Sequence, residues 1–280
     1  MTRIVKGMDI ANKIGENLAD DVTELANRGI TPTLAILRVG AKQSDVAYER
    51  GAIKRCQKVG VAVKSVVLPE QVTQDDMIRQ IKQLNTDIQV HGILIMRPLP
   101  ESIDDEVVRS TLLPEKDVDG ITYESMIGSY AGIERGFAPC TAQACMEVLK
   151  YFHIDVKGKH ITVVGSSLVV GRPVAMMLLN AFATVDICNV FTDDVPAECR
   201  MADIIIAAAG CPNLIGRECV KEGQIVLDVG INIDAQGKIR GDVDEEAVNG
   251  IVEWLTAVPG GIGTVTTAVL AEHVIRAAMS

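Results

Sequence analysis

Aromatic residues are scarce in this chain. Only 3% of its 280 residues are Phe, Trp or Tyr, with a single tryptophan, although 48% are hydrophobic. The cores must therefore be built from aliphatic side chains, and such a composition favours parallel β-sheets that helices cover on both faces. The length allows one large or two medium domains, each with its own core.

Positive charge and long apolar runs are also lacking. The formal net charge is −10 and the pI is near 5.0, which argues against a surface for nucleic acid or an anionic membrane. No run of 18 apolar residues occurs, and the first ten residues have no signal-peptide core. We expect a soluble, cytoplasmic protein.

The cysteines and histidines do not form a metal-binding pattern. There are seven cysteines, an odd number without any C-x-x-C pair, and only four scattered histidines. This spacing does not match that of zinc ligands, so the sequence predicts no metal site. We expect most of the thiols to be buried as small hydrophobic groups in a reducing compartment.

The most informative segment is the glycine turn between Ile161 and Asn180. A β-branched run ends at Gly165, Gly171 follows, and Pro173 opens an apolar helical pattern. The pattern predicts a strand, a tight turn and a helix N-terminus, an arrangement with which α/β proteins hold a phosphate or dinucleotide. The loop is longer than the usual G-x-G-x-x-G turn, so a plain connection without a ligand is the alternative.

Strand and helix patterns alternate along both halves of the chain. Strands are predicted at 33–39, 62–68, 91–96, 161–164, 184–188, 204–208 and 225–229, and helices at 10–26, 45–59, 73–84, 141–152 and 264–279. We therefore predict an α/β protein of two lobes, residues 1–140 and 141–263, the second a Rossmann-like, doubly wound parallel sheet. Helix 264–280 is expected to pack back on the first lobe, and the cleft between the lobes is the expected ligand site.

Five segments carry more than fold information. They are Tyr48 in SDVAYERGAIKRC, Pro98-Leu99-Pro100, KDVDG from Lys116 to Gly120, the glycine turn, and VPGGIG from Val258 to Gly263. Two more segments, DVGIN at 228–232 and GDV at 241–243, follow in the second half of the chain. With all of these segments in this order, the chain resembles the methylenetetrahydrofolate dehydrogenase/cyclohydrolase family along essentially its whole length. The resemblance implies oxidation of 5,10-methylenetetrahydrofolate with a nicotinamide cofactor, and hydrolysis of the methenyl product to 10-formyltetrahydrofolate in most members.

The resemblance also implies a folate-binding catalytic domain at 1–140, a dinucleotide-binding domain at 141–263 and a homodimer. Tyr48 would stack along the folate, and Asp119 would hydrogen-bond the pterin, because a carboxylate accepts two donors side by side. The alternatives are a structural tyrosine and a turn aspartate. Backbone at Pro98, Leu99 and at Pro259, Gly260 and Gly261 would approach the substrate.

For the cofactor, the resemblance places Gly165, Ser166, Ser167 and Gly171 against the phosphates and Ile231 near the nicotinamide. Ser166 and Val190 stand where members that use NADP hold the 2′-phosphate, a group that prefers Arg or Lys. With Asp193 and Asp194 close by in sequence, we expect NAD rather than NADP, although Arg172 is a nearby cation. Asp186 lies mid-strand and is not assigned to the ribose.

The chain departs from the family pattern at two catalytic positions. The family's lysine, four residues after the tyrosine, is Ala52 here, and the glutamine before the Pro-Leu-Pro segment is Met96. Lys54 follows Tyr48 by six residues, which turns it about 240° around a helix and away from the tyrosine's face. We therefore predict a dehydrogenase without the hydrolase step. The alternative is a bifunctional enzyme in which Lys54 or another base replaces the family's lysine. Lys54 is then a third catalytic candidate, in addition to Tyr48 and Asp119.

Two further readings stay open. One is a non-catalytic nucleotide-binding or regulatory protein, which the missing lysine would suit. The other is a two-lobed dehydrogenase acting on shikimate or amino acids, since KDVDG could imitate the Lys-Asp pair that such enzymes use.

Overall fold

The computed structural model describes residues 1–234 and 236–280. The chain forms two compact units. Unit 1 comprises Met1–Ala11, Tyr130–Gly132 and Thr141–Thr266, and unit 2 comprises Asn12–Ser129, Ile133–Cys140 and Thr267–Ser280. Four helices have residues in both units: α1 (Met8–Asn17), α6 (Tyr123–Ala131), α7 (Cys140–Tyr151) and α11 (Ile262–Met279).

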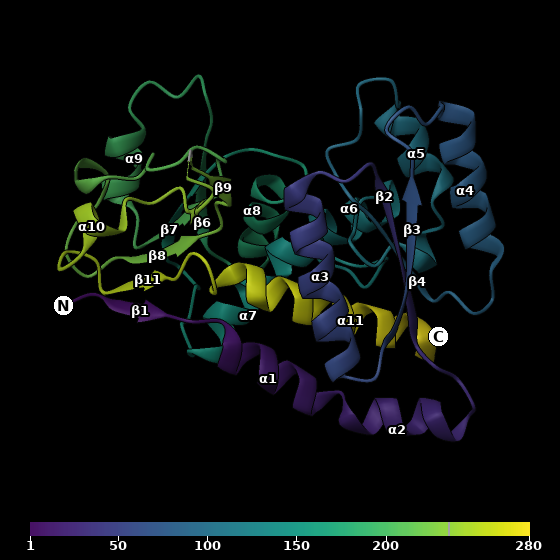
Figure 1. The fold of residues 1–280 in the computed structure, drawn as a ribbon. Coiled ribbons are helices and arrows are strands. Elements are labelled where there is room, and N and C mark those ends of the chain that lie inside the picture. The colour runs from purple at the N-terminus through teal and green to yellow at the C-terminus, as the bar shows by residue number, and fades with distance from the viewer. Residues whose placement is uncertain (235) are drawn as a thin grey trace. The chain divides into compact units, whose positions relative to one another are not determined.

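Unit 1 is built on a six-stranded sheet in which all strands run parallel (Figure 1). Its order is β1-β11-β8-β7-β5-β6, with β1 at Arg3–Val5, β11 at Trp254–Thr256, β8 at Ile225–Asp228, β7 at Ile204–Ala207, β5 at His160–Val164 and β6 at Thr184–Cys188. All four residues of β7 are buried, as expected of a parallel strand covered on both faces.

The strand order reverses direction beside β5. The chain passes from β5 to β6 on one side and then crosses to β7 on the other side of β5. In doubly wound sheets, this reversal opens a crevice at the carboxyl ends of the strands, where ligands bind. The observed topology confirms the predicted Rossmann-like α/β sheet.

The remaining elements of unit 1 are short. They are α8 (Gly171–Asn180), α9 (Val195–Met201), α10 (Glu245–Val248), the 3-10 turn η2 (Arg217–Cys219) and the hairpin β9 (Asn232–Ile233) to β10 (Ile239–Arg240). Side-chain oxygens of Asp194 and Asp244 cap α9 and α10 by accepting backbone N–H groups. Aliphatic side chains and the thiols of Cys188, Cys199 and Cys219 fill the core.

Unit 2 contains a smaller parallel sheet of order β3-β2-β4 (Figure 1). Its strands are β2 (Thr33–Val39), β3 (Ala62–Leu68) and β4 (Gly92–Ile95), and its other elements are α2 (Ala19–Asn27), α3 (Gln43–Lys58), α4 (Gln74–Thr86), α5 (Asp105–Thr111) and the 3-10 turn η1 (Pro114–Lys116). Leu34, Ile36 and Leu37 of the central strand are fully buried, each contributing about 1.5–3 kcal/mol.

The predicted and observed elements agree where the pattern is long. The strands at 33–39, 62–68 and 184–188 have the predicted bounds. The helix predicted at 10–26 is instead two helices, because the N–H of Leu18 bonds the carbonyl of Gly15 and closes a tighter turn there. The three-residue strand β1 was not predicted.

The units divide between Cys140 and Thr141, but they differ from the predicted division at the N-terminus and at Tyr130–Gly132. The first eleven residues group with unit 1, because β1 pairs with β11 through Ile4 and Leu255. Residues 267–280 group with unit 2, where Val274 lies against Gly92. Among the described residues, no helix is both long and apolar enough to cross a membrane.

Candidate functional site

The first aspartate of KDVDG is a structural residue. Asp117 is completely buried, and its carboxylate accepts four hydrogen bonds, from the backbone N–H groups of Ile121 and Thr122 and from the hydroxyls of Thr122 and Ser125, at 2.7–2.9 Å. A buried carboxylate is tolerated when its oxygens are satisfied in this way. Asp117 therefore fixes the loop that carries the second aspartate.

The second aspartate, Asp119, is half-buried and lies beside Tyr48 and Cys140. Its pKa is raised to about 7: burial is the largest cause and the charge of Asp117 adds to the rise, whereas Cys140 and Arg97 oppose it. Burial and the charge of Asp119 raise the pKa of Tyr48 well above its usual value. The structure thus brings together two predicted site residues, and the turn-aspartate alternative fits Asp117 better than Asp119.

Gly120 allows another segment to approach this loop. It has a φ of +70°, and a Cβ at this position would lie 2.5–2.7 Å from backbone atoms of Phe137, Ala138 and Pro139. Only glycine fits such an approach. The segment that passes Gly120 leads into Cys140, the first residue of α7, and so brings Cys140 to Asp119.

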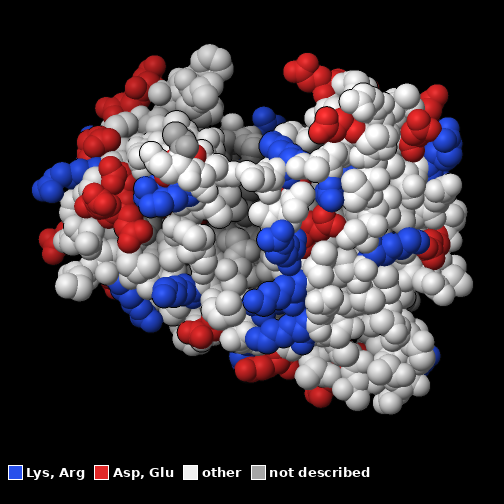
Figure 2. All heavy atoms as spheres, viewed as in Figure 1, with Lys and Arg blue, Asp and Glu red and all other residues white. Residues whose placement is uncertain are grey.

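Helix α3 carries Ala52, one of the two positions where the chain departs from the family pattern. It runs unbroken from Gln43 to Lys58, so Lys54 is not returned to the face of Tyr48 by any local rewinding. Ala52 is 0% exposed, whereas Lys54 is exposed with Arg50 and Lys58 at intervals of four residues. Basic side chains gather over α3 in Figure 2. Lys54 is therefore part of a solvated basic face and is not brought to the other site residues.

The segment after β4 adds a cation to this region. Met96 is buried at the end of β4, and a cis peptide bond joins Arg97 to Pro98. Arg97 donates to the carboxylate of Asp105, which also accepts from Nε of Arg109 at 2.6 Å. Two cations thus share one carboxylate, and the excess positive charge favours the ionised form of Asp119. Leu99 packs against the core of unit 2.

In unit 1, the glycine turn follows β5 as predicted. Gly165 has a φ of +118°, and a Cβ there would lie 2.1 Å from the carbonyl oxygen of Ala208, which follows β7. A Cβ on Gly171 would lie 1.9 Å from the carbonyl oxygen of Gly165. Both glycines are therefore required for a close approach of backbone to backbone. The hydroxyl of Ser167 accepts the N–H of Val170 at 3.1 Å.

The other predicted cofactor residues follow parallel strands at their carboxyl ends. Val190 comes after β6 and is 92% exposed, and Ile231 comes after β8 with its side chain near Gly263. Pro259, Gly260 and Gly261 follow β11 and belong to unit 1, so they do not share a unit with Tyr48 and Asp119. Because parallel strands end at one edge, these loops lie at the same edge as the glycine turn.

Two buried aspartates shape that edge. Asp242 accepts the N–H groups of Ala209 and Gly210 at 2.7 and 2.9 Å, and Asp228 accepts those of Gly230, Asp242 and Val243. Burial raises the pKa of Asp228 to about 6, against the effect of these hydrogen bonds. The two carboxylates fix the loops after β7 and β8.

The cations and acids near the glycine turn are already engaged. Arg172 is exposed, and its Nε donates to the carbonyl of Ser166 at 2.9 Å. Asp186 pairs with His160 across the β5–β6 ladder, which supports leaving it unassigned to a ribose. Asp194 caps α9. The exposed side chain of Val190 has no group that could pair with a phosphate.

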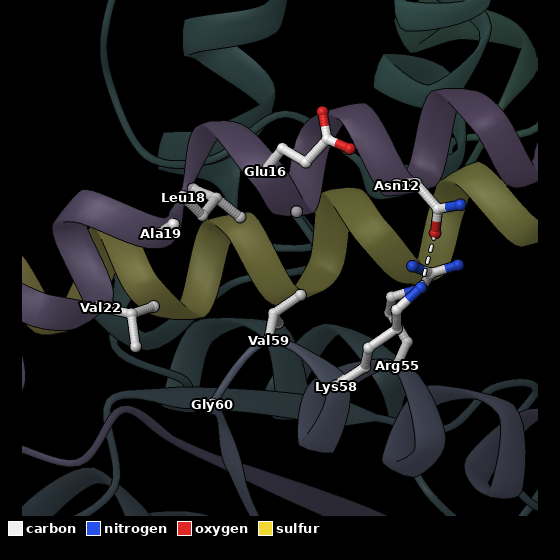
Figure 3. Close-up of a pocket in the computed structure, with 10 residues that line it drawn as sticks. Asn12, Glu16, Leu18, Ala19, Val22, Arg55, Lys58, Val59 and Gly60 are labelled. Atoms are coloured by element: carbon white, nitrogen blue, oxygen red, sulfur yellow. Dashed lines mark hydrogen bonds between the residues drawn. The ribbon is translucent and has the colours of Figure 1, made fainter.

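A separate cavity of about 520 Å³ lies in unit 2 between the α1–α2 junction and the C-terminal end of α3 (Figure 3). Lys58 donates to the amide oxygen of Asn12 at 2.7 Å on its polar side, and Leu18, Val22 and Val59 provide apolar walls. None of the predicted site residues lines it. Tyr48 lies eleven residues before Val59, about 16 Å along the helix. Across residues 1–234 and 236–280, no cluster of His, Cys, Asp or Glu is arranged to hold a metal ion.

Sequence reasoning missed several residues that shape these sites. Cys140 influences Asp119 from 21 positions away, and Asp242 lies in the GDV segment, which the sequence analysis named only as a family motif. Arg97 was not singled out from the sequence. The helical pattern beginning near 141 gave the one available signal for Cys140, because the first residue of a helix presents a free N–H to an acceptor.

Comparison with known proteins links both units to one family. The chain matches the family models "Tetrahydrofolate dehydrogenase/cyclohydrolase, catalytic domain" over residues 5–119 and "Tetrahydrofolate dehydrogenase/cyclohydrolase, NAD(P)-binding domain" over residues 139–280. A relative from Alkaliphilus metalliredigens, named bifunctional protein FolD, is 44% identical over 277 residues, which cover 99% of this chain and 98% of the relative.

Two solved structures are similar throughout. The bifunctional FolD methylenetetrahydrofolate dehydrogenase/cyclohydrolase of Campylobacter jejuni has a TM-score of 0.95 at 40% identity, covering 100% of this chain and 99% of that one. The methylenetetrahydrofolate dehydrogenase-cyclohydrolase of Trypanosoma brucei, complexed with NADP and an inhibitor, has a TM-score of 0.93 at 31% identity, covering 99% and 97%.

The glycine turn generates a stability prediction. Gly171→Ala is expected to destabilise the protein by about 1–3 kcal/mol or more and to weaken dinucleotide binding, because the new Cβ meets the Gly165 carbonyl. Thermal unfolding and titration with NAD measure both effects. Gly51→Ala is the control, because this helical glycine of α3 has open space around its Cβ position and no positive φ. Equal stability of the two variants would contradict the argument.

Asp119 generates a pH prediction. Its folded-state pKa of about 7 lies above the usual value near 3.9, so ionisation costs stability progressively as the pH rises from about 4 to 7. Asn cannot ionise, so Asp119→Asn is expected to raise the melting temperature above pH 7 and to change it little near pH 4, while folate binding is lost. Asp117→Asn should instead lower the melting temperature, because Asn replaces a carboxylate that accepts four donors. A melting temperature of Asp119→Asn below that of the unchanged protein at pH 8 would refute the assignment.

Proposed function

The chain belongs to the tetrahydrofolate dehydrogenase/cyclohydrolase family, and on this premise we propose that it oxidises 5,10-methylenetetrahydrofolate to 5,10-methenyltetrahydrofolate with a nicotinamide cofactor. The observation that carries the proposal is the position of Asp119 beside Tyr48 in unit 2, where burial raises the pKa of both groups. A desolvated carboxylate binds the paired N–H donors of a pterin edge more strongly than an exposed one does. An aromatic ring beside it offers a stacking surface.

A dinucleotide fits the glycine turn of unit 1. The space at Gly165 and Gly171 that a Cβ would fill is taken up by backbone, and Ser166 and Ser167 follow at the start of the loop before α8. Free N–H groups at a helix N-terminus stabilise phosphate. When bound, the nicotinamide accepts a hydride. We assign Gly165, Ser166, Ser167, Gly171, Val190 and Ile231 to this binding site.

The oxidation step does not require an acid or a base from the protein. The carbon that loses hydride is flanked by two nitrogens, whose lone pairs stabilise the resulting cation. The role proposed for the protein's residues is therefore to bind and orient: Asp119 and Tyr48 would fix the pterin, and backbone at Pro98 and Leu99 would lie against the substrate. The substrate contacts of Pro259, Gly260 and Gly261 stay predictions. Holding two reactants in near-attack geometry removes most of the entropic barrier.

Hydrolysis of the methenyl product differs from the oxidation, because a water molecule must be activated and its proton must be transferred to a base. We propose that this chain lacks the hydrolase step. Ala52 stands where the family has its lysine and is completely buried on an unbroken helix, and Met96 is likewise buried. Lys54 points into solvent with Arg50 and Lys58, which argues against its substitution for the lysine. The bifunctional relatives make retention of hydrolysis the second candidate.

We further propose that NAD is preferred to NADP. The 2′-phosphate of NADP carries up to two negative charges, and Ser166 and the exposed Val190 provide no cation for it. Arg172, the cation close by in sequence, donates through Nε to the carbonyl of Ser166. The homodimer and the cytoplasmic location that the resemblance implies stay predictions.

The dehydrogenase and its cofactor are tested together. Protein mixed with methylenetetrahydrofolate is expected to reduce NAD with a Michaelis constant at least about tenfold lower than that for NADP. Ser166→Arg is expected to reduce the difference between the Michaelis constants for NAD and NADP, because it supplies a guanidinium for the 2′-phosphate. A regulatory protein would bind NAD without reducing it, and a shikimate or amino-acid dehydrogenase would ignore the folate. Preference for NADP in the unchanged chain would refute the electrostatic argument.

The hydrolase step is tested with methenyltetrahydrofolate. The unchanged protein and Lys54→Ala are both expected to leave its hydrolysis at the buffer rate, as followed by loss of the methenyl absorbance. Ala52→Lys combined with Met96→Gln is expected to gain at least about tenfold over buffer, because it restores a general base and its partner. Met96→Gln alone is the matched control. Rapid hydrolysis by the unchanged protein that Lys54→Ala abolishes would establish the bifunctional alternative.

A further inference from the structure

The cavity between the α1–α2 junction and the C-terminal end of α3 is not used by the proposed oxidation. Its volume of about 520 Å³ lies within the range of about 300–1,000 Å³ that is typical of small-molecule sites. All residues that line it belong to unit 2, and none of them is assigned to the folate or the dinucleotide. The cavity is therefore available to a ligand of its own.

One end of this cavity carries two cations. Arg55 and Lys58 extend from α3 toward Asn12 of α1 (Figure 3). Lys58 donates to the amide oxygen of Asn12 at 2.7 Å, and because an amide is neutral, this contact does not neutralise the ammonium. Arg55 is only 7% exposed, and its guanidinium stays protonated in a protein. A cation that has lost much of its hydration attracts an anion more strongly than a solvated one does.

The acidic residue that lines the cavity is engaged elsewhere. Glu16 forms an ion pair with Lys13, which precedes it by three residues on the outer face of α1, at 3.9 Å. Figure 3 shows its carboxylate turned away from Arg55 and Lys58. Although the chain as a whole has a formal net charge of −10, this end of the cavity is cationic. Such a local charge favours an anionic group.

The other end of the cavity is apolar. Leu18, Val22 and Val59 provide its walls, and Ala19 lies beside them (Figure 3). Leu18 is buried, whereas Val22 and Val59 are partly exposed. An apolar group that enters from solvent would cover these aliphatic side chains, and the removal of apolar surface from water stabilises the complex.

We propose that this cavity binds a small molecule that has one carboxylate and an apolar body. The carboxylate matches the planar fork of the Arg55 guanidinium, with the Lys58 ammonium beside it, and the body lies against the apolar walls. A neutral molecule would gain from the walls alone, and a carboxylate without a body would gain from the cations alone. The site is distinct from that of the folate, because Val59 lies about 16 Å along α3 from Tyr48.

The test measures binding of octanoate to the full-length protein by isothermal titration calorimetry, below the concentrations at which octanoate forms micelles. One octanoate per chain is expected to bind saturably. Octanamide keeps the body without the charge, and acetate keeps the charge without the body, so each is expected to bind at least about tenfold more weakly. Saturating NAD or tetrahydrofolate is expected to leave the affinity for octanoate unchanged.

Substitutions test the two cations separately. Arg55→Met and Lys58→Met keep an unbranched side chain and remove the charge, so each is expected to weaken octanoate binding by at least about tenfold. Arg50→Met is the matched control, because Arg50 is exposed on the same helix and does not line the cavity. Val22→Phe fills the cavity from its apolar wall, and it tests the proposal even if Arg55→Met fails to fold.

Four results would overturn the inference: no saturable binding of octanoate, equal affinity for octanamide, displacement of octanoate by NAD or tetrahydrofolate, or unchanged affinity in Arg55→Met, Lys58→Met and Val22→Phe. None of these results depends on whether the protein oxidises methylenetetrahydrofolate.

Discussion

Parallel strand pairing is the constraint on which the rest of unit 1 depends. Because all six strands run in one direction, their carboxyl ends meet at one edge, and the glycine turn, Val190, Ile231 and the Pro259–Gly261 loop all follow strands that end there. The reversal of strand order beside β5 opens that edge. Gly165 and Gly171 then let backbone lie against backbone where side chains would block it.

In unit 2, two aspartates of the KDVDG loop have different roles. Asp117 and Asp119 are separated by one residue in the same loop, yet their surroundings differ. Asp117 accepts four hydrogen bonds from Ile121, Thr122 and Ser125, so its role is structural, whereas Asp119 lies beside Tyr48 and Cys140 and is proposed to accept hydrogen bonds from a ligand. This difference in hydrogen bonding distinguishes Asp117, which stabilises the loop, from Asp119, which is proposed to bind the ligand.

The sequence predicted those features that depend on local patterns. Strand β2 is a continuous aliphatic run bounded by turn residues, and the glycine turn is a short-range motif, so both were located from neighbouring residues alone. Ala52 and Met96 were read as departures because they fall at fixed positions relative to Tyr48 and Pro98. The family and the α/β fold follow from such patterns, and the comparisons and the structure confirm them.

The features that could not be predicted from the sequence depend on contacts between segments that are far apart along the chain. Asp119 meets Cys140 only because Gly120 admits the chain at 137–139, and His273 reaches Val118 from 155 residues away. The pairing of β1 with β11, which moves the first eleven residues to unit 1, joins residues 251 positions apart, and a strand of three residues is too short to show a periodic pattern. The break between α1 and α2 rests on one backbone hydrogen bond at Leu18.

Ala52 also bears on the energetics of folding. An ammonium at a fully buried helix position must lose its hydration, at a cost of several kcal/mol, and its four-carbon stem must be ordered. Alanine avoids both penalties and has the highest helix propensity of any residue. Alanine at this position therefore leaves α3 with a larger margin against unfolding, and such a margin lets a chain tolerate later destabilising substitutions elsewhere.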